Sequence, residues 1–210
     1  MDLFPPDPSA NLLPCDGTVN YHGRIFSMVD AHNYSAALLN EVPWQHDEVV
    51  IFGKHIITAR KVAWYGDSRL SYTYSGITRQ ALPWNETLMR LKAIVEQHCG
   101  TTFNSCLLNL YEHGDQGMTW HSDDEKSLAQ HAAIASLSFG AERRFCFKHK
   151  HTSQTAEIVL EHGSLLVMKD TTQTHWLHSI PKSKRITEPR INLTFRTIVG
   201  QDRVAESRFQ

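Results

Sequence analysis

Two side chains that could bind a metal ion stand close together at His121 and Asp123, separated by one serine. In an extended chain, side chains two positions apart share a face, so this imidazole and this carboxylate can reach one ion together. Two imidazoles and one carboxylate are the ligand set that holds Fe(II) with positions left open for O2 and a second substrate. The third ligand could be His175 or His178, which the spacing does not separate. The residue types therefore indicate iron-dependent oxidation.

Two other interpretations of these residues stay open on spacing alone. One is an exposed polar turn, because the segment 123–126 carries three acidic residues and a lysine. The other is zinc, which a site of two histidines and one aspartate also suits. A second histidine pair, His149 and His151, flanks a lysine. We interpret that pair as a solvated or phosphate-facing turn.

The segment from Arg190 to Arg196 has a polar face. Because alternate side chains of a strand point the same way, Arg190, Asn192, Thr194 and Arg196 share one face, and Ile191, Leu193 and Phe195 share the other. Asn109 and Tyr111 alternate with leucines in the same manner. Arginine presents a planar fork that binds a carboxylate at two points, so this face suits a dicarboxylate cosubstrate better than a hydrolytic zinc site.

The elements that must position these residues are mainly strands. Asp30 can cap a short helix that carries Leu38, and Asn85 can cap a longer helix that ends at Gly100. Short strand-like runs bounded by Gly, Pro, Asp and Asn are expected at 49–52, 55–59, 105–111, 132–139, 144–148, 157–160, 164–168 and 190–199. Many short strands after an early helix predict an α+β, mainly β fold, a double-stranded β-helix (jelly-roll) barrel braced by N-terminal helices.

Length and composition indicate one globular domain of 210 residues. We expect an extended lead-in over 1–14, a single domain over 15–199 and a polar tail over 200–210. The four widely spaced cysteines indicate free thiols, and the N-terminus resembles no signal peptide, so a cytoplasmic, membrane-free monomer is expected. Net charge is −1, but basic residues gather in two places: Arg143, Arg144, Lys148 and Lys150, and Lys182, Lys184 and Arg185.

Taken together, these segments resemble the AlkB-type Fe(II)/2-oxoglutarate-dependent dioxygenases, and most closely their nucleic-acid-repair branch. The resemblance covers about residues 44–198 and includes His121-x-Asp123, His178, and Arg190 with Arg196 six residues later. Further matching segments are Ile51-Phe52-Gly53-Lys54, Trp64-Tyr65-Gly66-Asp67, Tyr72-Thr73-Tyr74-Ser75-Gly76, Asn109-Leu110-Tyr111, Asp123-Asp124-Glu125 and Ala135-Ser136-Leu137-Ser138-Phe139-Gly140.

The resemblance implies a role for each matching residue. It implies that His121, Asp123 and His178 ligate the iron, which selects His178 over His175. It places 2-oxoglutarate on Asn109, Tyr111, Arg190, Asn192, Thr194 and Arg196. It also implies a substrate-binding set: Phe52 as a wedge in the duplex, Tyr74 and His121 stacking on the flipped base, Tyr72, Asp124 and Glu125 along its polar edge, and Gly53, Lys54 and Thr73 nearby.

The activity implied by the resemblance is oxidative demethylation of alkylated bases such as N1-methyladenine and N3-methylcytosine. The expected substrate is DNA, with RNA as a further candidate, and the expected cosubstrates are O2 and 2-oxoglutarate, which is converted to succinate as formaldehyde is released. Carboxylates at Asp124 and Glu125 would favour a cationic lesion over its neutral parent. The alternatives are a hydroxylase of a protein or lipid with the same metal site, and a non-catalytic barrel that binds alkylated nucleic acid.

Overall fold

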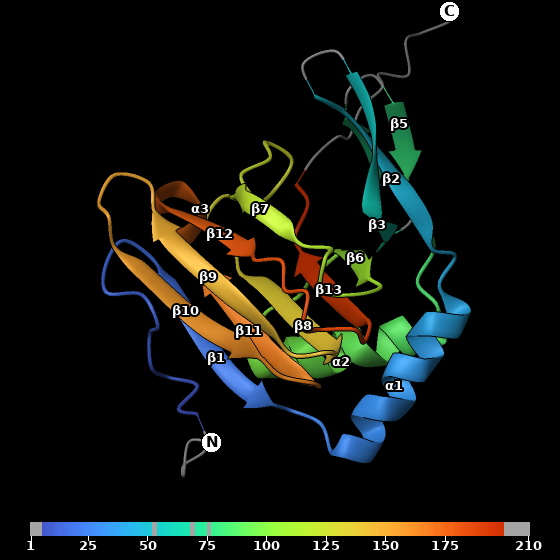
Figure 1. The fold of residues 1–210 in the computed structure, drawn as a ribbon, viewed down its shortest axis with the longest axis horizontal. Coiled ribbons are helices and arrows are strands. Elements are labelled where there is room, and N and C mark those ends of the chain that lie inside the picture. The colour runs from blue at the N-terminus through green and yellow to red at the C-terminus, as the bar shows by residue number, and fades with distance from the viewer. Residues whose placement is uncertain (1–5, 52–53, 68–69, 75–76, 200–210) are drawn as a thin grey trace, which may run out of the picture.

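The computed structural model describes residues 6–51, 54–67, 70–74 and 77–199, and for 47–51, 54–56, 71–74 and 77–79 it describes the backbone alone. The helices are α1 (Met28–Glu41), α2 (Glu86–Cys99) and α3 (Thr172–His175). The strands (Figure 1) are β1 (Thr18–Arg24), β2 (Gln45–Ile51), β3 (Lys54–Gly66), β4 (Ser71–Tyr74), β5 (Ile77–Gln80), β6 (Ser105–Tyr111), β7 (Met118–His121), β8 (Ile134–Gly140), β9 (Arg143–His149), β10 (Thr155–Leu160), β11 (Ser164–Lys169), β12 (Trp176–Ile180) and β13 (Arg190–Arg196).

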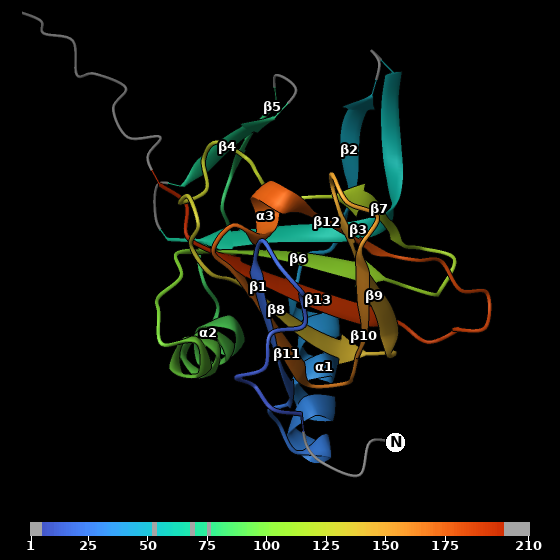
Figure 2. The ribbon, with the colours of Figure 1, turned by 90° about the vertical axis from the view of Figure 1, so that its left-hand side faces the viewer.

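Two antiparallel sheets face each other. The large sheet has the order β1-β11-β8-β13-β6-β3-β2, and the small sheet has the order β10-β9-β12-β7. A separate hairpin joins β4 to β5. Figures 1 and 2 show both the β2–β3 hairpin and the β4–β5 hairpin rising from the end of the barrel at which β7 lies. The expected jelly-roll barrel is confirmed.

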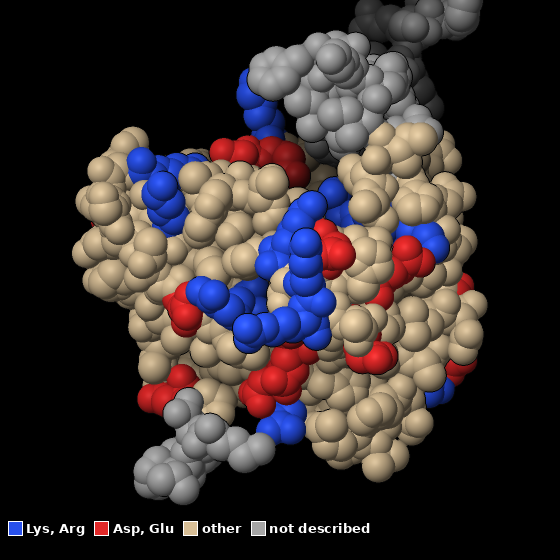
Figure 3. Space-filling view, viewed as in Figure 1, with Lys and Arg blue, Asp and Glu red and all other residues tan. Residues whose placement is uncertain are grey.

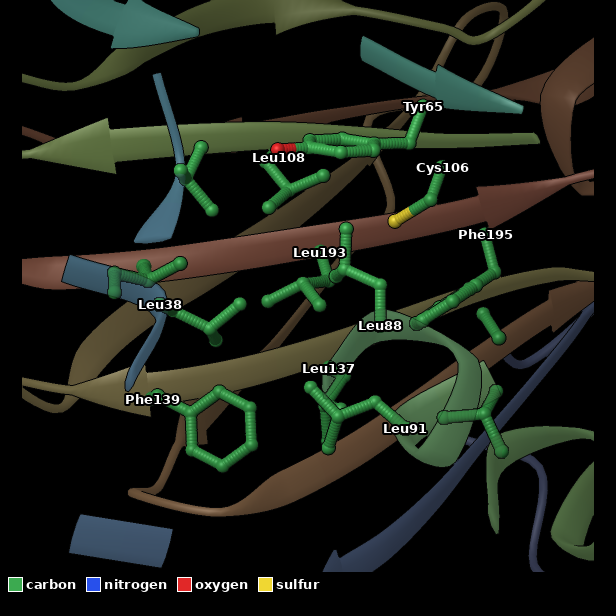
Figure 4. Close-up of a cluster of buried hydrophobic side chains, with 14 of the residues drawn as sticks. Leu38, Tyr65, Leu88, Leu91, Cys106, Leu108, Leu137, Phe139, Leu193 and Phe195 are labelled. Atoms are coloured by element: carbon green, nitrogen blue, oxygen red, sulfur yellow. The ribbon is translucent and has the colours of Figure 1, made fainter. Parts of the chain in front are cut away.

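The two long helices cover the outer face of the large sheet. Asn85 caps α2 by accepting from the backbone N–H of Leu88, and Gly100 ends it in the left-handed conformation with φ of 65°. Leu88 and Leu91 of α2 pack against Leu137 and Leu193 of the sheet (Figure 4). The predicted brace of helices on one side is therefore confirmed, and it keeps the large sheet from flexing beneath the site.

A second hydrophobic cluster fills the space between the two sheets. It contains Phe145 and Phe147 of β9, Trp176 and Ile180 of β12, and Leu166 of β11. The strand β12 runs antiparallel to β7 on one side and to β9 on the other. This cluster therefore fixes the height of β12 above the inner face of the large sheet.

Some of the expected elements differ from those observed. Ser27, not Asp30, caps α1, because the Ser27 hydroxyl accepts from the N–H of Asp30. The strands β1, β7 and β12 were not expected, since their sequences lack clear alternation and gain their pairing from neighbours across the sheet. Residues 200–210 lie outside the described residues. Within the described part, neither long helix has the length or apolar character to cross a membrane.

Candidate metal and cosubstrate site

The structure brings together three of the side chains that the sequence singled out. His121 ends β7 and pairs in register with His178 on β12, while Asp123 follows two residues after β7. Asp123 Oδ1 lies 3.8 Å from His121 Nε2 and 4.0 Å from His178 Nε2. One ligand atom from each residue lies within 4.8 Å of the others. By contrast, His175 in α3 stacks on His149, with ring centroids 6.0 Å apart.

The protonation of these groups suits a divalent cation. His121 Nδ1 lies 2.8 Å from the carbonyl oxygen of Thr119, so it carries the proton and leaves the Nε2 lone pair facing the cluster. Burial lowers the pKa of His178 to about 3, which keeps that imidazole neutral. Burial alone would raise the pKa of Asp123, but the charge of Arg196 beside it outweighs burial, so the pKa is lowered and the carboxylate stays ionised. Two imidazoles with one carboxylate fit Fe(II).

Asp123 is held from two sides. The Arg196 guanidinium donates to its Oδ2 at 2.7 Å, and the Gln173 side-chain oxygen accepts from its backbone N–H at 2.8 Å. Gln173 was not singled out from the sequence, where a lone glutamine in a polar stretch gives no signal. Gln173 reaches the backbone of Asp123 only because the short helix α3 lies against the segment after β7, a contact that the sequence does not indicate.

Arg190 is a buried cation with unused donors. The side chain is completely buried, and its Nη2 donates to Ser138 Oγ at 2.9 Å and to Asn192 Oδ1 at 2.8 Å. Its Nε and Nη1 have no partner. A buried guanidinium with two orphaned donors is costly unless an anion completes it. These donors therefore fit the carboxylate of 2-oxoglutarate.

The polar face predicted for 190–196 lies inside the barrel. Arg190, Asn192 and Thr194 are buried, and Asn109, Tyr111, Asn192, Thr194 and Arg196 border the same pocket as the three possible metal ligands. Asn192, Thr194 and Arg196 thus line the pocket, as the alternation predicts, whereas Arg190 lies behind the lining and is bonded to Asn192.

Three polar neighbours of this face were not assigned from the sequence. Ser136 donates to Asn192 Oδ1, Ser138 accepts from Arg190, and Arg60 of β3 donates through Nε to Asn109 Oδ1 at 2.9 Å. The two serines had a signal, because they alternate with Ala135, Leu137 and Phe139 in β8. Arg60 had none, since its strand shows no alternation around it.

The residues expected at the substrate are only partly described. Asp124 and Glu125 border a separate cavity of about 360 Å³ that adjoins the metal cluster at Asp123. Asp124 is exposed, while Glu125 Oε2 is buried without a partner. Phe52 and Gly53 lie outside the described residues. Lys54, Tyr72, Thr73 and Tyr74 belong to strands whose side chains are not described.

Arg143, in the first of the two basic groups of the sequence, is buried and not on the surface. Its guanidinium is 1% exposed, and Nη2 donates to the carbonyl oxygens of Gly114, Gln116 and Pro181. It therefore ties the segment before β7 to the segment after β12. Arg144, the next residue, is exposed and pairs with Glu157, as alternation in a half-buried strand requires.

A second cluster, formed by Cys15, Asp16 and His149, resembles a metal site by distance alone. His149 Nδ1 accepts from the backbone N–H groups of His151 and Thr152, so the proton of the neutral ring sits on Nε2. That nitrogen faces Asp16 Oδ2 at 3.2 Å as a donor. Because Nε2 lacks a free lone pair, His149 is a structural residue that orders a turn.

Comparisons with known proteins agree with this geometry. A model of the "2OG-Fe(II) oxygenase superfamily" matches residues 18–196. The chain is 42% identical over 198 residues to the Bos taurus protein "DNA oxidative demethylase ALKBH2", covering 89% of this chain and 69% of that protein. It is 42% identical over 178 residues to the Homo sapiens protein "Alpha-ketoglutarate-dependent dioxygenase alkB homolog 3", covering 80% of this chain and 62% of that protein.

A solved structure, "The structure of OsALKBH1", has the same fold, with a TM-score of 0.58 at 14% identity over 88% of this chain and 98% of that one. The family match spans both sheets, including the strands that carry His121, His178 and Arg190. The chain belongs to the 2OG-Fe(II) oxygenase superfamily and is an Fe(II)/2-oxoglutarate-dependent dioxygenase of AlkB type.

Proposed function

We propose that this protein repairs nucleic acid by oxidative demethylation of alkylated bases such as N1-methyladenine and N3-methylcytosine. One oxygen atom of O2 enters succinate as 2-oxoglutarate loses CO2, and the other enters the N-methyl group, which leaves the restored base as formaldehyde. The observation that carries this proposal is the cluster of His121, Asp123 and His178, whose pocket is also lined by Asn192. Asn192 accepts a hydrogen bond from the buried Arg190, which has two further donor atoms without a hydrogen-bond partner. The relatives named as DNA oxidative demethylases support the same activity.

On the metal side, His121, Asp123 and His178 would ligate Fe(II), which when bound supplies the oxidation of the N-methyl group. Arg196 holds the Asp123 carboxylate in one orientation, and Gln173 fixes its backbone. Arg190 would receive a carboxylate of 2-oxoglutarate, with Asn109, Tyr111, Asn192 and Thr194 lining the remaining surface. The buried hydrophobic side chains of both sheets exclude water from beneath this pocket.

On the substrate side, the cavity next to Asp123 would receive the flipped base. Asp124 and Glu125 border it, and their negative charges favour a cationic methylated base. Tyr72, Thr73 and Tyr74 of the β4–β5 hairpin would contact the base, Tyr74 by stacking against it opposite His121. Phe52, with Gly53 and Lys54, would enter the gap that the base leaves in a duplex.

A basic segment between β12 and β13 suits the phosphates of such a substrate. Lys182, Lys184 and Arg185 are exposed there, and Figure 3 shows Lys and Arg side chains gathering near the middle of the face on which β12 and this segment lie. DNA is the proposed substrate, with RNA as a second. That the chain acts as a monomer and in the cytoplasm stays a prediction.

The test is release of formaldehyde, succinate and the unmodified base from a methylated oligonucleotide with Fe(II), 2-oxoglutarate and ascorbate. Asp123→Ala should release none of these, because it removes one of only three protein ligands. Succinate without demethylation of any oligonucleotide would favour a hydroxylase of a protein or lipid. Binding of methylated oligonucleotides without any succinate would favour a non-catalytic barrel.

A further inference from the structure

Trp120 differs from every other tryptophan of the chain. Its side chain is 46% exposed, and among the described residues its indole N–H has no acceptor and its ring has no aromatic partner. The other four are at least partly buried and donate their indole N–H to a protein oxygen: Trp44 to Leu38, Trp64 to Ser105, Trp84 to Asp67 and Trp176 to Cys15. The ring of Trp120 is thus open to solvent, with both its apolar face and its indole N–H accessible to a ligand.

Trp120 lies between the two positions at which β7 pairs with β12, Met118 and His121, where the register of the pairing shifts. It immediately precedes His121, whose ring is bonded to the Thr119 carbonyl oxygen. β7 is the last strand of the small sheet, so its outer edge has no strand beside it in the described structure. The indole therefore stands at an open sheet edge, one residue from a proposed metal ligand.

The surroundings of β7 carry the charge that a nucleic-acid strand requires. The basic segment after β12 is bonded to the segment before β7, through Gly114 N–H to the Ile186 carbonyl oxygen and Ser183 N–H to the Gly114 carbonyl oxygen. Lys182 lies against Gly117, just before β7 begins. Basic side chains that could bind phosphates thus lie next to the segment that leads into β7, the strand that carries the exposed ring.

We propose that Trp120 is a stacking platform for an unpaired nucleobase next to the lesion, on the same strand of a nucleic acid. This inference rests on the proposed function and adds a binding site outside the lesion pocket. A base has a flat face that a single indole matches without any apolar surroundings, whereas a protein partner requires a broad apolar patch. The other exposed large apolar side chains in the described part of the chain lie on other elements, which favours the base.

The experiment measures binding of a fluorescent methylated single-stranded oligonucleotide by anisotropy, alongside its demethylation. Trp120→Thr removes the ring but keeps a residue that favours strands, and Trp120→Phe keeps an aromatic face. Val159→Ala is the matched control, since Val159 is 44% exposed on β10 at the opposite edge of the same sheet. A second oligonucleotide carries abasic nucleotides on both sides of the lesion, so that no neighbouring base can stack.

We expect Trp120→Thr to weaken binding of the normal oligonucleotide by about tenfold, in keeping with the loss of one base–aromatic stack. Trp120→Phe should bind nearly as the wild type does, and Val159→Ala should not differ from it. On the abasic oligonucleotide, Trp120→Thr and the wild type should bind equally. KM should follow the affinity while kcat stays unchanged.

Equal affinity of Trp120→Thr and wild type for the normal oligonucleotide would overturn the proposal. So would an equal loss on both oligonucleotides, which would indicate a change in the fold or in phosphate contacts. Failure of the proposed function looks different, because the wild type would then release no formaldehyde from either oligonucleotide, whatever the variants bind.

Discussion

Replacing Arg190 by methionine separates a cosubstrate-binding role from a structural one, because the two roles predict opposite outcomes. Burial lowers the pKa of Arg190 to about 10, well below its usual value. Since a tenfold change in proton affinity is about 1.4 kcal/mol, burial of this cation costs on the order of 3 kcal/mol. Methionine, of similar length, removes that cost.

The same substitution also removes two hydrogen bonds, to Ser138 and to Asn192, each with a net contribution of about 1 kcal/mol. The Arg190→Met variant without cosubstrate should therefore have a free energy of unfolding equal to that of the wild type, or higher by about 1 kcal/mol. For 2-oxoglutarate, loss of two charge-assisted hydrogen bonds of about 1.5–3 kcal/mol each should weaken binding by roughly a hundredfold to ten-thousandfold. Arg190→Lys should weaken it less, since one point charge remains.

The assay is calorimetric titration of 2-oxoglutarate into the Mn(II)-loaded protein without O2, with urea unfolding of the metal-free protein in parallel. Arg144→Met is the matched control, because Arg144 is exposed and neighbours the buried Arg143 on β9. It should change neither quantity. A large loss of stability in Arg190→Met, with unchanged affinity for 2-oxoglutarate, would show that Arg190 is a structural residue and refute this reasoning.

Four further substitutions test the site and its supports. Co(II) at a hundredfold excess over its Kd should stabilise the wild type by about 2.7 kcal/mol. His178→Ala should abolish this stabilisation and His175→Ala should keep it, as measured by thermal unfolding with and without Co(II). The reverse pattern would show that His175, and not His178, is the ligand. Phe52→Ala should slow repair of duplex oligonucleotides by about tenfold and leave repair of single strands nearly unaffected, because only a duplex has a gap for the ring to fill. Equal losses of rate on both substrates, with a lower melting temperature of the protein, would show that Phe52 is a core residue. Arg143→Met should lower the free energy of unfolding by about 2 kcal/mol, because three carbonyl oxygens lose their donor. A variant as stable as the wild type in urea unfolding would show that Arg143 does not hold the segment before β7 against the segment after β12.

The sequence by itself determined those features that depend on neighbouring positions. The polar face from Arg190 to Arg196 follows from the two-residue period of a strand, and the structure places Asn192, Thr194 and Arg196 of that face in the pocket. The ends of α2 follow from Asn85 and Gly100, whose local hydrogen bonding and backbone freedom need no tertiary contact. The candidate iron ligands followed from residue types, although spacing alone left His175 and His178 equal.

Only the tertiary structure decided which distant residues meet. His178 lies beside His121 because β12 pairs with β7, whereas His175 ends the short α3 turn before that strand begins. Arg143 and Arg144 are neighbouring arginines that alternation places on opposite faces of β9. Packing of one face of β9 inside the barrel buries Arg143 and leaves Arg144 exposed. Trp120 is exposed because no other part of the described structure covers the face of β7 to which it points. Strand order and sheet packing arise from contacts between residues far apart in the chain, which local patterns do not encode.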